Sequence, residues 1–288
     1  MQDQGKISQE ITKAAVMDSA QIKEHWRDWA TTRTGACATS MCETIKQLEI
    51  DALARRLRIL KPNLVLEAGC GNGMNCIALA MQFPRIVFYG FDYLPEMIEA
   101  AKQNAKEAAK QTAKRPAGTR ALHVQFLVGD LFEQANYSDR HDVVISNRLI
   151  INFNAIEKQQ EAIQILGSKI HYGGHLLLIE NSITMRNEQN KLRALLGLPA
   201  RSVAPFNRFV TEDEIKSHLD SAGLELIEIE DFMSLHDLLL YVLIPKLNGG
   251  HVDYEHPLVK IATELSLKTD PNKFGSWGQN RLFVCRKP

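Results

Sequence analysis

The sequence predicts an α/β fold, in which a mostly parallel sheet is covered by helices on both faces. Two observations predict it. From Leu64 onward, short runs of β-forming residues alternate with segments of helical periodicity, as in chains that build parallel sheets. The first of these runs leads into a loop with three glycines, the kind of loop that holds a nucleotide-like cofactor at the edge of such a sheet.

Four runs in the first half of this alternation are expected to be strands, because they are short and rich in aliphatic, β-branched and aromatic residues: 64–68, 86–92, 122–130 and 142–147. A helix is expected over about 75–82. A long helix follows from Leu94, with Pro95 in its first turn, where the missing N–H of proline costs no hydrogen bond.

The second half continues the pattern. A helix over 155–170 is expected to end at a turn formed by Gly173 and Gly174. A later helix is expected to begin at Thr211 as N-cap, with Glu214 completing a capping box, and to end at Gly223. The remaining strands are expected over 175–181, 224–232 and 281–287.

Three stretches fall outside this alternation. Residues 1–60 are expected to form a mostly helical N-terminal cap, and residues 184–210 and 233–278 to be irregular insertions between core elements. The chain has no internal repeat and no low-complexity linker. A length of 288 residues is therefore interpreted as one domain, 1–288, around a core at 61–183.

The composition is that of an ordinary globular protein, with 45% hydrophobic and 24% charged residues. Because 34 basic residues balance 34 acidic ones, no net charge draws the chain toward nucleic acid or an anionic membrane. Nucleic acid is therefore disfavoured as a partner. The lysines repeated every four residues on the helix after Leu94 are interpreted as a solvated face: Lys102, Lys106, Lys110 and Lys114.

The cysteines indicate a reducing compartment. The chain has five of them, an odd number without a C-x-x-C pair, so they are expected to be free thiols. The first residues lack the apolar core of a signal peptide, and the longest apolar run, 238–245, is too short to span a bilayer. We therefore expect a cytoplasmic protein that does not enter the membrane.

The glycine loop favours one cofactor over another. A dinucleotide loop has the spacing G-x-G-x-x-G, whereas this loop has Gly69, Gly71 and Gly73, with Glu67 two positions ahead of the first glycine. S-adenosylmethionine has no pyrophosphate, and its ammonium group suits a nearby carboxylate. An acid at the end of a strand, beside bare backbone, therefore favours S-adenosylmethionine.

The stretch EAGCGNG at 67–73 resembles the first motif, (D/E)-x-G-x-G-x-G, of the class I S-adenosylmethionine-dependent methyltransferases. The block RLIINF, from Arg148, and the segment from Asn190 to Ile215 resemble the bacterial small-molecule members of this family. Three further blocks follow in the family's order: Asp92 at a strand end, VGDLF at 128–132, and HDVVISNRLIINF with GGHLLLIEN at 141–181. The resemblance implies a Rossmann-like sheet of seven strands, with the last strand antiparallel, and S-adenosylmethionine as cofactor.

The resemblance also implies roles for single residues. Asp92 is expected to accept both ribose hydroxyls, and Asp130 with Leu131 to bind adenine. The residues expected to complete the cofactor site are Glu67, Gly69, Gly71, Gly73, Tyr93, Met97, Asn147 and Arg33. Ordinary structural roles stay open: Glu67 as an anion at a helix N-terminus, Asp92 as a helix cap, and Met97 as apolar wall.

The residues after the fourth and fifth strands and the two insertions are expected to line the acceptor side. Arg148 and Asn152 are the candidates for orienting the substrate, with a salt bridge and a helix N-cap as the respective alternatives. The remaining candidates on this side are Asn147, Glu180 and Asn207. A base could be His251 or His256, although loop histidines are more often simple surface residues.

The segment 25–41 combines two tryptophans with a run of threonines ahead of a helix. We expect Trp26, Trp29 and Arg33 to close over the cofactor as a lid, with the arginine meeting a carboxylate. The alternative is that both tryptophans only fix the N-terminal helix to the core.

Together these features predict a methyltransferase that uses S-adenosylmethionine to methylate oxygen or nitrogen of a small metabolite or a glycan precursor. The alternatives are a protein or RNA methyltransferase of the same fold, a dinucleotide-linked oxidoreductase, and a cofactor-binding subunit without catalysis. No metal is expected, since no zinc-ligand spacing occurs, although Cys37, Cys42 and Cys285 leave a cysteine site for arsenic open. A homodimer is also left open.

Overall fold

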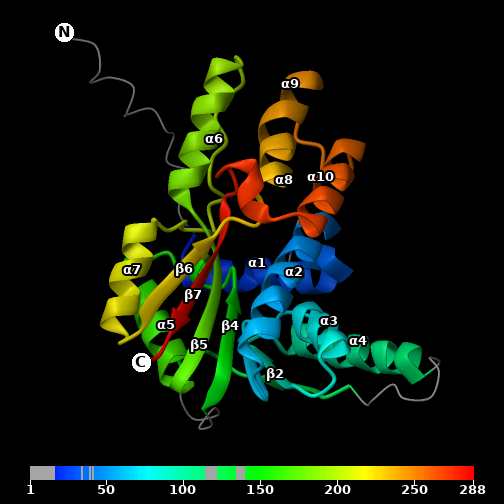
Figure 1. Cartoon of the computed structure of the whole chain (residues 1–288), viewed down its shortest axis with the longest axis vertical. Helices are drawn as coiled ribbons and strands as arrows, with labels where there is room; N and C mark the ends of the chain where they lie inside the picture. Colours follow the sequence, from blue (N-terminus) through cyan, green and yellow to red (C-terminus); the bar gives the residue numbers. More distant parts are fainter. Residues whose placement is uncertain (1–16, 34, 39, 41, 114–121, 134–139) are drawn as a thin grey trace.

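The computed structural model describes the chain except for residues 1–16, 34, 39, 41, 114–121 and 134–139 (Figure 1). Within the described residues, seven strands form one sheet in the order β3-β2-β1-β4-β5-β7-β6. Strand β7 is antiparallel to both of its neighbours, and the other pairs are parallel. The strands are β1 (Leu64–Ala68), β2 (Val87–Asp92), β3 (Val124–Val128), β4 (His141–Asn147), β5 (Ile170–Asn181), β6 (Glu225–Glu230) and β7 (Asn280–Arg286).

The described helices are α1 (Ser19–Thr32), α2 (Glu43–Leu60), α3 (Met74–Gln82), α4 (Pro95–Ala113), α5 (Ile156–Ser168), α6 (Ile183–Leu195), α7 (Glu212–Ser221), α8 (Ser234–Leu238), α9 (Ile244–Leu247) and α10 (Pro257–Lys268). The first two precede β1, and the others lie between strands. Short helical turns are η1 (Gly35–Ala38), η3 (Ile150–Asn152), η5 (Pro271–Phe274) and the π-helical η4 (Leu239–Leu243). The predicted fold, with its antiparallel last strand, is confirmed.

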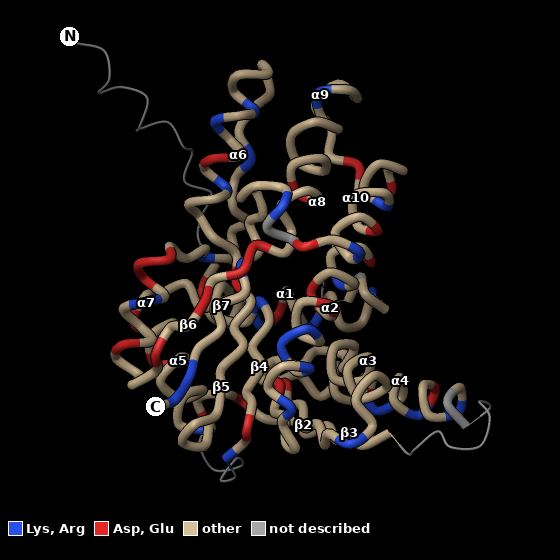
Figure 2. Tube along the Cα trace, viewed as in Figure 1, with Lys and Arg blue, Asp and Glu red and all other residues tan. Residues whose placement is uncertain are grey.

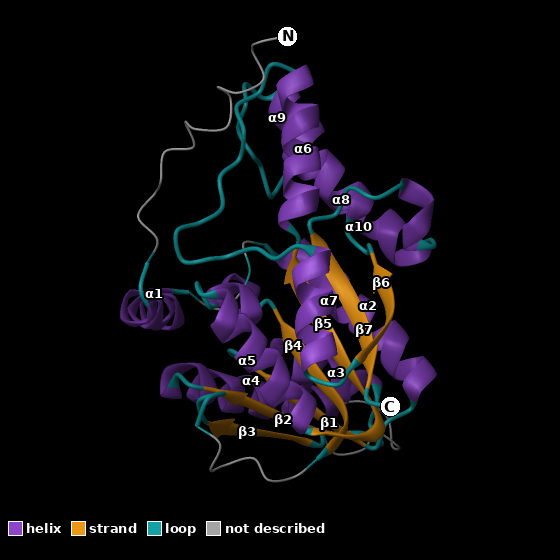
Figure 3. Ribbon diagram, turned by 90° about the vertical axis from the view of Figure 1, so that its left-hand side faces the viewer, coloured by secondary structure: helices purple, strands orange, loops and turns teal. Residues whose placement is uncertain are grey.

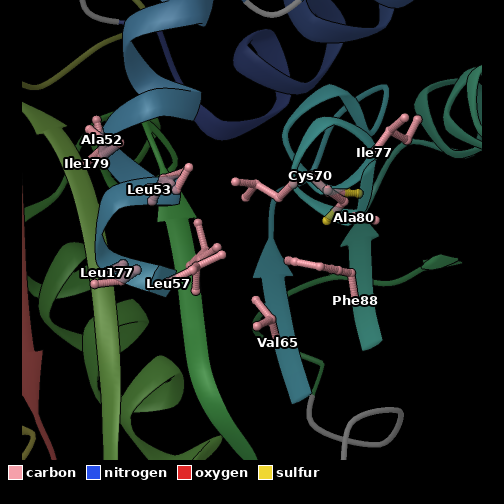
Figure 4. Packing of buried hydrophobic residues seen from close by; sticks show 14 of the residues in the cluster. Ala52, Leu53, Leu57, Val65, Cys70, Ile77, Ala80, Phe88, Leu177 and Ile179 are labelled. Carbon is pink, nitrogen blue, oxygen red and sulfur yellow. The ribbon is translucent and has the colours of Figure 1, made fainter. Parts of the chain in front are cut away.

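The central strands are apolar on both faces because each face is covered by helices. Successive residues point to opposite sides of a strand, so Val65 joins the core under α2, α3 and α4 while Leu66 joins the core under α5 and α7. Strand β5 repeats this division, with Leu177 in the first core and Leu176 in the second. Figure 4 shows the first core, with the α2 side chains packed on β5 and β4.

The sheet order reverses between β1 and β4. From β1 the chain moves outward to β2 and β3, and then crosses back to β4 on the other side. The connections after β1 and β4 therefore leave the sheet in opposite directions and open a crevice at the carboxyl ends of these strands. The glycine loop lies at this point, between β1 and α3.

The expectation of irregular insertions at 184–210 and 233–278 is wrong. The first contains most of α6, and the second contains α8, η4, α9 and α10. These helices rise above the carboxyl ends of the parallel strands (Figures 1 and 3). The helical pattern of α6 was hidden because the buried face of this helix carries Arg186, Gln189 and Arg193, which are polar.

The expected turn at Gly173 and Gly174 is an irregularity inside a longer strand. Strand β5 begins at Ile170, and its register against β4 shifts before it becomes regular at His175. Gly173 has a φ of +79°, and a Cβ on Gly174 would lie 2.7 Å from the carbonyl oxygen of Asp142. The glycines therefore let the strand bulge and pass close to β4. The predicted capping box of α7 is confirmed: Thr211 accepts from the N–H of Glu214, and Glu214 from that of Thr211.

Along most of the described trace, acidic and basic residues are interspersed, and acidic residues gather on α7 and β6 (Figure 2). The lysines of α4 that the structure describes, Lys102, Lys106 and Lys110, are exposed, and Lys114 lies outside the described residues. In the part of the chain that the structure describes, every helix is too short or too polar to cross a bilayer. The described thiols Cys42, Cys70, Cys76 and Cys285 are free and buried.

Candidate active site

The loop after β1 has a backbone that side chains would not tolerate. Gly69, Gly71 and Gly73 all have positive φ angles, of +66°, +53° and +77°. At Gly73 space is also lacking, because a Cβ there would lie 2.5 Å from Cζ of Phe126 and 2.9 Å from Cβ of Ala101. The three glycines thus bring bare backbone to the crevice and let α3 begin close to the sheet.

Asp92, at the end of β2, is joined to the glycine loop. Its Oδ2 accepts from the N–H of Gly71 at 3.0 Å, and its Oδ1 accepts from the N–H of Leu94 at 3.0 Å. The second bond closes a short turn at Leu94, the residue before α4 begins. A helix cap would instead accept from an N–H inside the first turn of the helix. Burial raises the pKa of Asp92 to about 6, although these backbone bonds favour the charged form.

Glu67 lies in β1, two residues before the loop, and is 1% exposed. Its carboxylate accepts from Nδ2 of Asn75 at 2.6 Å and from Sγ of Cys76 at 3.0 Å. Both partners belong to the first turn of α3, where a negative charge interacts favourably with the helix dipole. Burial raises the pKa of Glu67, so an approaching cation would stabilise the carboxylate.

A cavity of about 1100 Å³ extends from the glycine loop to α6 and η4. Its walls come from α1, the loops after β1, β2, β3, β4 and β5, and both insertions. The predicted site residues that line it are Trp26, Trp29, Glu67, Gly69, Gly71, Asp92, Tyr93, Met97, Asp130, Leu131, Asn147, Arg148, Asn152 and Asn207. The predicted residues that do not line it are Arg33, Gly73, Glu180, His251 and His256.

The residue Glu49, on α2, organises the floor of the cavity. It is fully buried, and its oxygens lie 2.8 Å from Nε of Arg148 and 2.8 Å from Nζ of Lys46. Asn147 also donates to Glu49, at 2.9 Å. Burial alone would raise the pKa of Glu49, but the two cations hold it below its ordinary value.

This network explains an unusual backbone. Arg148 has a φ of +55°, in the left-handed region that side chains rarely adopt. Its ion pair with Glu49 holds the turn after β4, which confirms the salt bridge considered for Arg148. A strained residue next to a cavity is a common feature of functional sites.

Asn152 joins three parts of the cavity wall. Its Oδ1 accepts from Nε1 of Trp26 at 3.2 Å and from Nδ2 of Asn207 at 3.0 Å, and its Nδ2 donates to the carbonyl of Arg148 at 2.8 Å. The N-cap of α5 is Ala155, so the alternative of an N-cap role for Asn152 is wrong. These bonds tie α1 and the first insertion to the loop after β4.

Helix α1 contributes residues to the cavity wall and lies against α4. Lys23 forms an ion pair with Asp130 at 3.2 Å, and the ring of Trp26 packs near Met97. Arg33 does not reach the cavity, because its guanidinium lies over the ring of Trp29 at 3.7 Å. Arg33 is therefore separated from the cavity by Trp29, which does line it.

Glu180 is buried behind the loop that follows β4. It accepts from the N–H of Ile150 at 2.8 Å and from that of Ile151 at 3.3 Å. Burial raises its pKa to about 8, only partly opposed by these bonds and by Arg148. Glu180 thus positions η3 rather than facing an acceptor.

Several cavity residues escaped the sequence reasoning. They lie on α2, on α6 with the loop after it, and in the stretch from α8 up to β7: Lys46, Arg186, Arg201, Asp237, Tyr241 and Gln279. Glu49 lies behind them and binds Lys46. One signal was available, because Arg186, Gln189 and Arg193 recur on a single face of α6. A polar stripe of this kind usually faces solvent, and only the surrounding fold shows that it is buried.

Among the described residues, no group of three or more His, Cys, Asp or Glu side chains is arranged to hold a metal ion. The side chain of Cys37, part of the arsenic alternative, lies outside the described part of the chain.

Comparison with known proteins places this site in a family. Residues 61–223 match the family described as "Methyltransferase domain". The release factor glutamine methyltransferase of Aliivibrio fischeri is 32% identical over 97 residues, which are 33% of this chain and 30% of that protein. The chain therefore matches less than a third of that relative's length.

Solved structures share the fold. The magnesium protoporphyrin IX methyltransferase (ChlM) of Synechocystis PCC 6803, with bound S-adenosylmethionine, superposes with a TM-score of 0.55 at 17% identity, over 96% of this chain and 100% of that chain. An O-methyltransferase family protein from Burkholderia thailandensis gives a TM-score of 0.50 at 16% identity, over 65% and 53%. Because the family match covers more than half of the chain, and the sheet is the one that the glycine loop predicts, this chain belongs to the methyltransferase-domain family and has the class I fold.

Proposed function

We propose that this chain transfers the methyl group of S-adenosylmethionine to an oxygen or nitrogen atom of a small molecule, a metabolite or a glycan precursor, inside the cavity. The observation that carries the proposal is the carboxylate of Asp92. It is bonded to the glycine loop through Gly71 and lines the cavity from the end of β2.

The groups around the loop fit S-adenosylmethionine. Its ribose offers two adjacent hydroxyl donors, for which Asp92 supplies a carboxylate. Its ammonium group suits Glu67 and the Oδ1 atoms of Asn75 and Asn147, which line the cavity and have no hydrogen-bond partner among the described residues. The residues proposed for the adenine side are Tyr93, Met97, Asp130 and Leu131. When bound, S-adenosylmethionine supplies an electrophilic methyl group.

A dinucleotide fits the same groups poorly. Its pyrophosphate would lie at the glycine loop and the start of α3, against the buried carboxylate of Glu67, and like charges in a buried site repel strongly. Asp92 does not separate the two cofactors, because its carboxylate suits the ribose hydroxyls of either one. The oxidoreductase alternative is therefore disfavoured on electrostatic grounds as well as by the glycine spacing.

The chain's own contribution is to position the acceptor and to exclude water. Helix α1 covers the donor side of the cavity through Trp26 and Lys23. We propose that Arg148 and Asn152 orient the acceptor, Arg148 held by Glu49 and Asn152 by its bonds to two loops. Alignment of two reactants in a dry site supplies a large part of the rate in transfer reactions.

A small acceptor agrees with the shape of the site. The cavity has walls from both insertions and a cover from α1, so a folded macromolecule has no flat surface to dock against at the methyl donor. We also propose that the chain is one domain, in which 1–60 covers the site, 61–183 binds the cofactor and the insertions at 184–210 and 233–278 face the acceptor. The short match to a protein methyltransferase keeps a protein acceptor as an outcome for the test.

The test is calorimetric titration with S-adenosylhomocysteine and, separately, with NAD. We expect micromolar binding of S-adenosylhomocysteine, loss of at least tenfold in affinity in Asp92→Asn, and no binding of NAD. Because ribose hydroxyls donate to the ionised form of Asp92, wild-type affinity should also weaken as the pH falls below about 6. Asp220→Asn, an exposed carboxylate on α7, is the matched control.

Binding of NAD but not of S-adenosylhomocysteine would reverse the proposal. After binding is established, labelled S-adenosylmethionine is incubated with metabolite extracts and with intact protein and RNA. A labelled small molecule supports the proposed acceptor class, and label found only in protein or RNA contradicts it. Cytoplasmic location and a homodimer stay predictions, to be checked by cell fractionation and light scattering.

A further inference from the structure

Two arginines face the cavity from the first insertion without a carboxylate partner among the described residues. Arg186, on α6, is 6% exposed, and its Nη1 donates to the carbonyl of Ser202 at 2.5 Å. Its Nε has no hydrogen-bond partner among the described residues. Arg201, in the loop after α6, donates from Nη1 to the side-chain oxygens of Gln189 at 2.9 Å and Gln279 at 3.4 Å. All of these acceptors are neutral.

Both guanidinium groups are held in place. Arg201 lies over the ring of Tyr241, 3.3 Å from the centroid, and its backbone exchanges two hydrogen bonds with the side chain of Asn190. Arg186 lies over the ring of Phe209 at 4.9 Å. Stacking occupies the faces of a guanidinium and leaves its N–H edges for a ligand.

The charge of this region is not balanced by its own acids. The carboxylate of Asp237 lines the cavity there, but it binds Nδ1 of His236 at 3.0 Å and the N–H of Gln279 at 2.8 Å. Although burial opposes it, the bond to Asp237 raises the pKa of His236 to about 9, so these two side chains neutralise each other. Burial and the charge of Arg201 lower the pKa of Arg186 only to about 10, so Arg186 is a cation at neutral pH.

A buried cation next to a second, half-buried one is destabilised unless an anion lies between them or beside them. We propose that Arg186 and Arg201 bind an acid group of the methyl acceptor, a carboxylate or a phosphate, so that the substrate is an organic acid. This rests on the proposed function, since it assigns the acceptor end of the same cavity.

The acid group serves as the anchor and not as the methylated atom. An oxyanion that accepts several charge-assisted hydrogen bonds from guanidinium groups is a poor nucleophile, because its electron pairs are stabilised. The methyl group is therefore transferred to another oxygen or nitrogen of the same molecule, whose apolar body contacts the rings of Tyr241 and Phe209.

The experiment titrates the full-length protein, saturated with S-adenosylhomocysteine, with benzoate, phenyl phosphate and the neutral benzamide. We expect benzoate or phenyl phosphate to bind tenfold or more tightly than benzamide. Whichever of the two binds more tightly shows whether the acceptor carries a carboxylate or a phosphate. Arg201→Gln should weaken that binding by about tenfold or more, and the double variant Arg186→Gln/Arg201→Gln should abolish it. Arg58→Gln, an exposed arginine on α2, is the matched control.

Equal binding of acids and benzamide would overturn the proposal. So would acid binding that is unchanged in the double variant, or a lack of saturable binding of both acids up to about 10 mM. If variants that carry Arg186→Gln do not fold, the acid affinity of Arg201→Gln alone tests the proposal. Unchanged affinity of Arg201→Gln for S-adenosylhomocysteine shows that this variant is folded. The two proposals can fail separately. If the protein does not bind S-adenosylhomocysteine but still binds acids through these arginines, the proposed function is rejected and the acid-binding site is retained.

Discussion

Glu67 and Asp92 illustrate how single residues serve both fold and site. Glu67 binds the first turn of α3, and Asp92 binds the glycine loop and the turn ahead of α4, yet both line the cavity. From the sequence alone, a structural role and a functional role were alternatives for each of these residues. In the structure they coincide, because the residues that end parallel strands also meet the helices that follow them.

Gly73 permits a prediction at this scale. An alanine there would be strained, because the backbone has a φ of +77°, in the left-handed region. Its Cβ would also lie 2.5 Å from Cζ of Phe126. Strain contributes about 1–2 kcal/mol and overpacking about 1–3 kcal/mol, so we expect Gly73→Ala to lower the free energy of unfolding by about 2–5 kcal/mol in urea titrations.

Gly197 supplies the control. Its φ is +71°, but a Cβ there meets nothing within 4 Å. Gly197→Ala should therefore show only the strain, about 1 kcal/mol. Equal losses in both variants would mean that packing at Gly73 contributes nothing.

At the scale of elements, α6 is one of the helices that the sequence did not predict. The buried face of α6 is polar, and it is held by backbone carbonyls: Arg193 donates from Nε to the carbonyl of Pro199 at 2.8 Å and from Nη1 to that of Tyr241. Tyr241 lies in the π-helical turn η4. Such turns insert an extra residue and often occur at functional sites, here carrying the ring under Arg201.

Helix α1 gives a second prediction. If it covers the cavity through the bond between Trp26 and Asn152, Trp26→Ala should weaken S-adenosylhomocysteine binding by about tenfold in calorimetry. Stability should change little, because α1 contributes only Ile22 as a fully buried residue.

The alternative, in which the tryptophans only fix α1 to the core, makes the opposite prediction. Trp26→Ala would then lower the thermal midpoint of unfolding and leave the affinity unchanged. Trp29→Ala is the matched variant, because Trp29 stacks under Arg33 and has no hydrogen bond to the loop after β4 among the described contacts.

For the whole molecule, the buried Glu180 predicts a dependence of stability on pH. Its pKa rises from an ordinary 4.5 to about 8 in the folded state, so the folded protein binds a proton that the unfolded chain releases between these values. The contribution of Glu180 to stability is complete below pH 4.5 and is lost as the pH rises toward 8, by up to about 1.4 kcal/mol per pH unit.

Glu180→Gln isolates this contribution, since the amide keeps an acceptor for Ile150 but does not titrate. The stability of wild type relative to Glu180→Gln should fall between pH 5 and pH 8 in urea titrations. A difference in stability that stays constant across this range would contradict a raised pKa for the buried carboxyl of Glu180.

The sequence by itself determined the sheet, its helices on both faces and the cofactor end of the site. These features are local: strand periodicity, the glycine spacing at 69–73 and the acids at strand ends all appear within a few residues of one another. Neighbouring residues also fix the capping box of α7 and the start of α4, which is why those boundaries were predicted closely.

Only the tertiary structure decided the acceptor end. Glu49 is an ordinary helix residue until α2 packs on β4 and brings it against Arg148, and Glu180 is an ordinary strand residue until the loop after β4 folds over it. Arg186 and Arg201 read as solvated charges until α6 turns inward above the sheet. Burial of a charge depends on what packs around it, and the packing partners lie far apart in the chain, so no local pattern could reveal it.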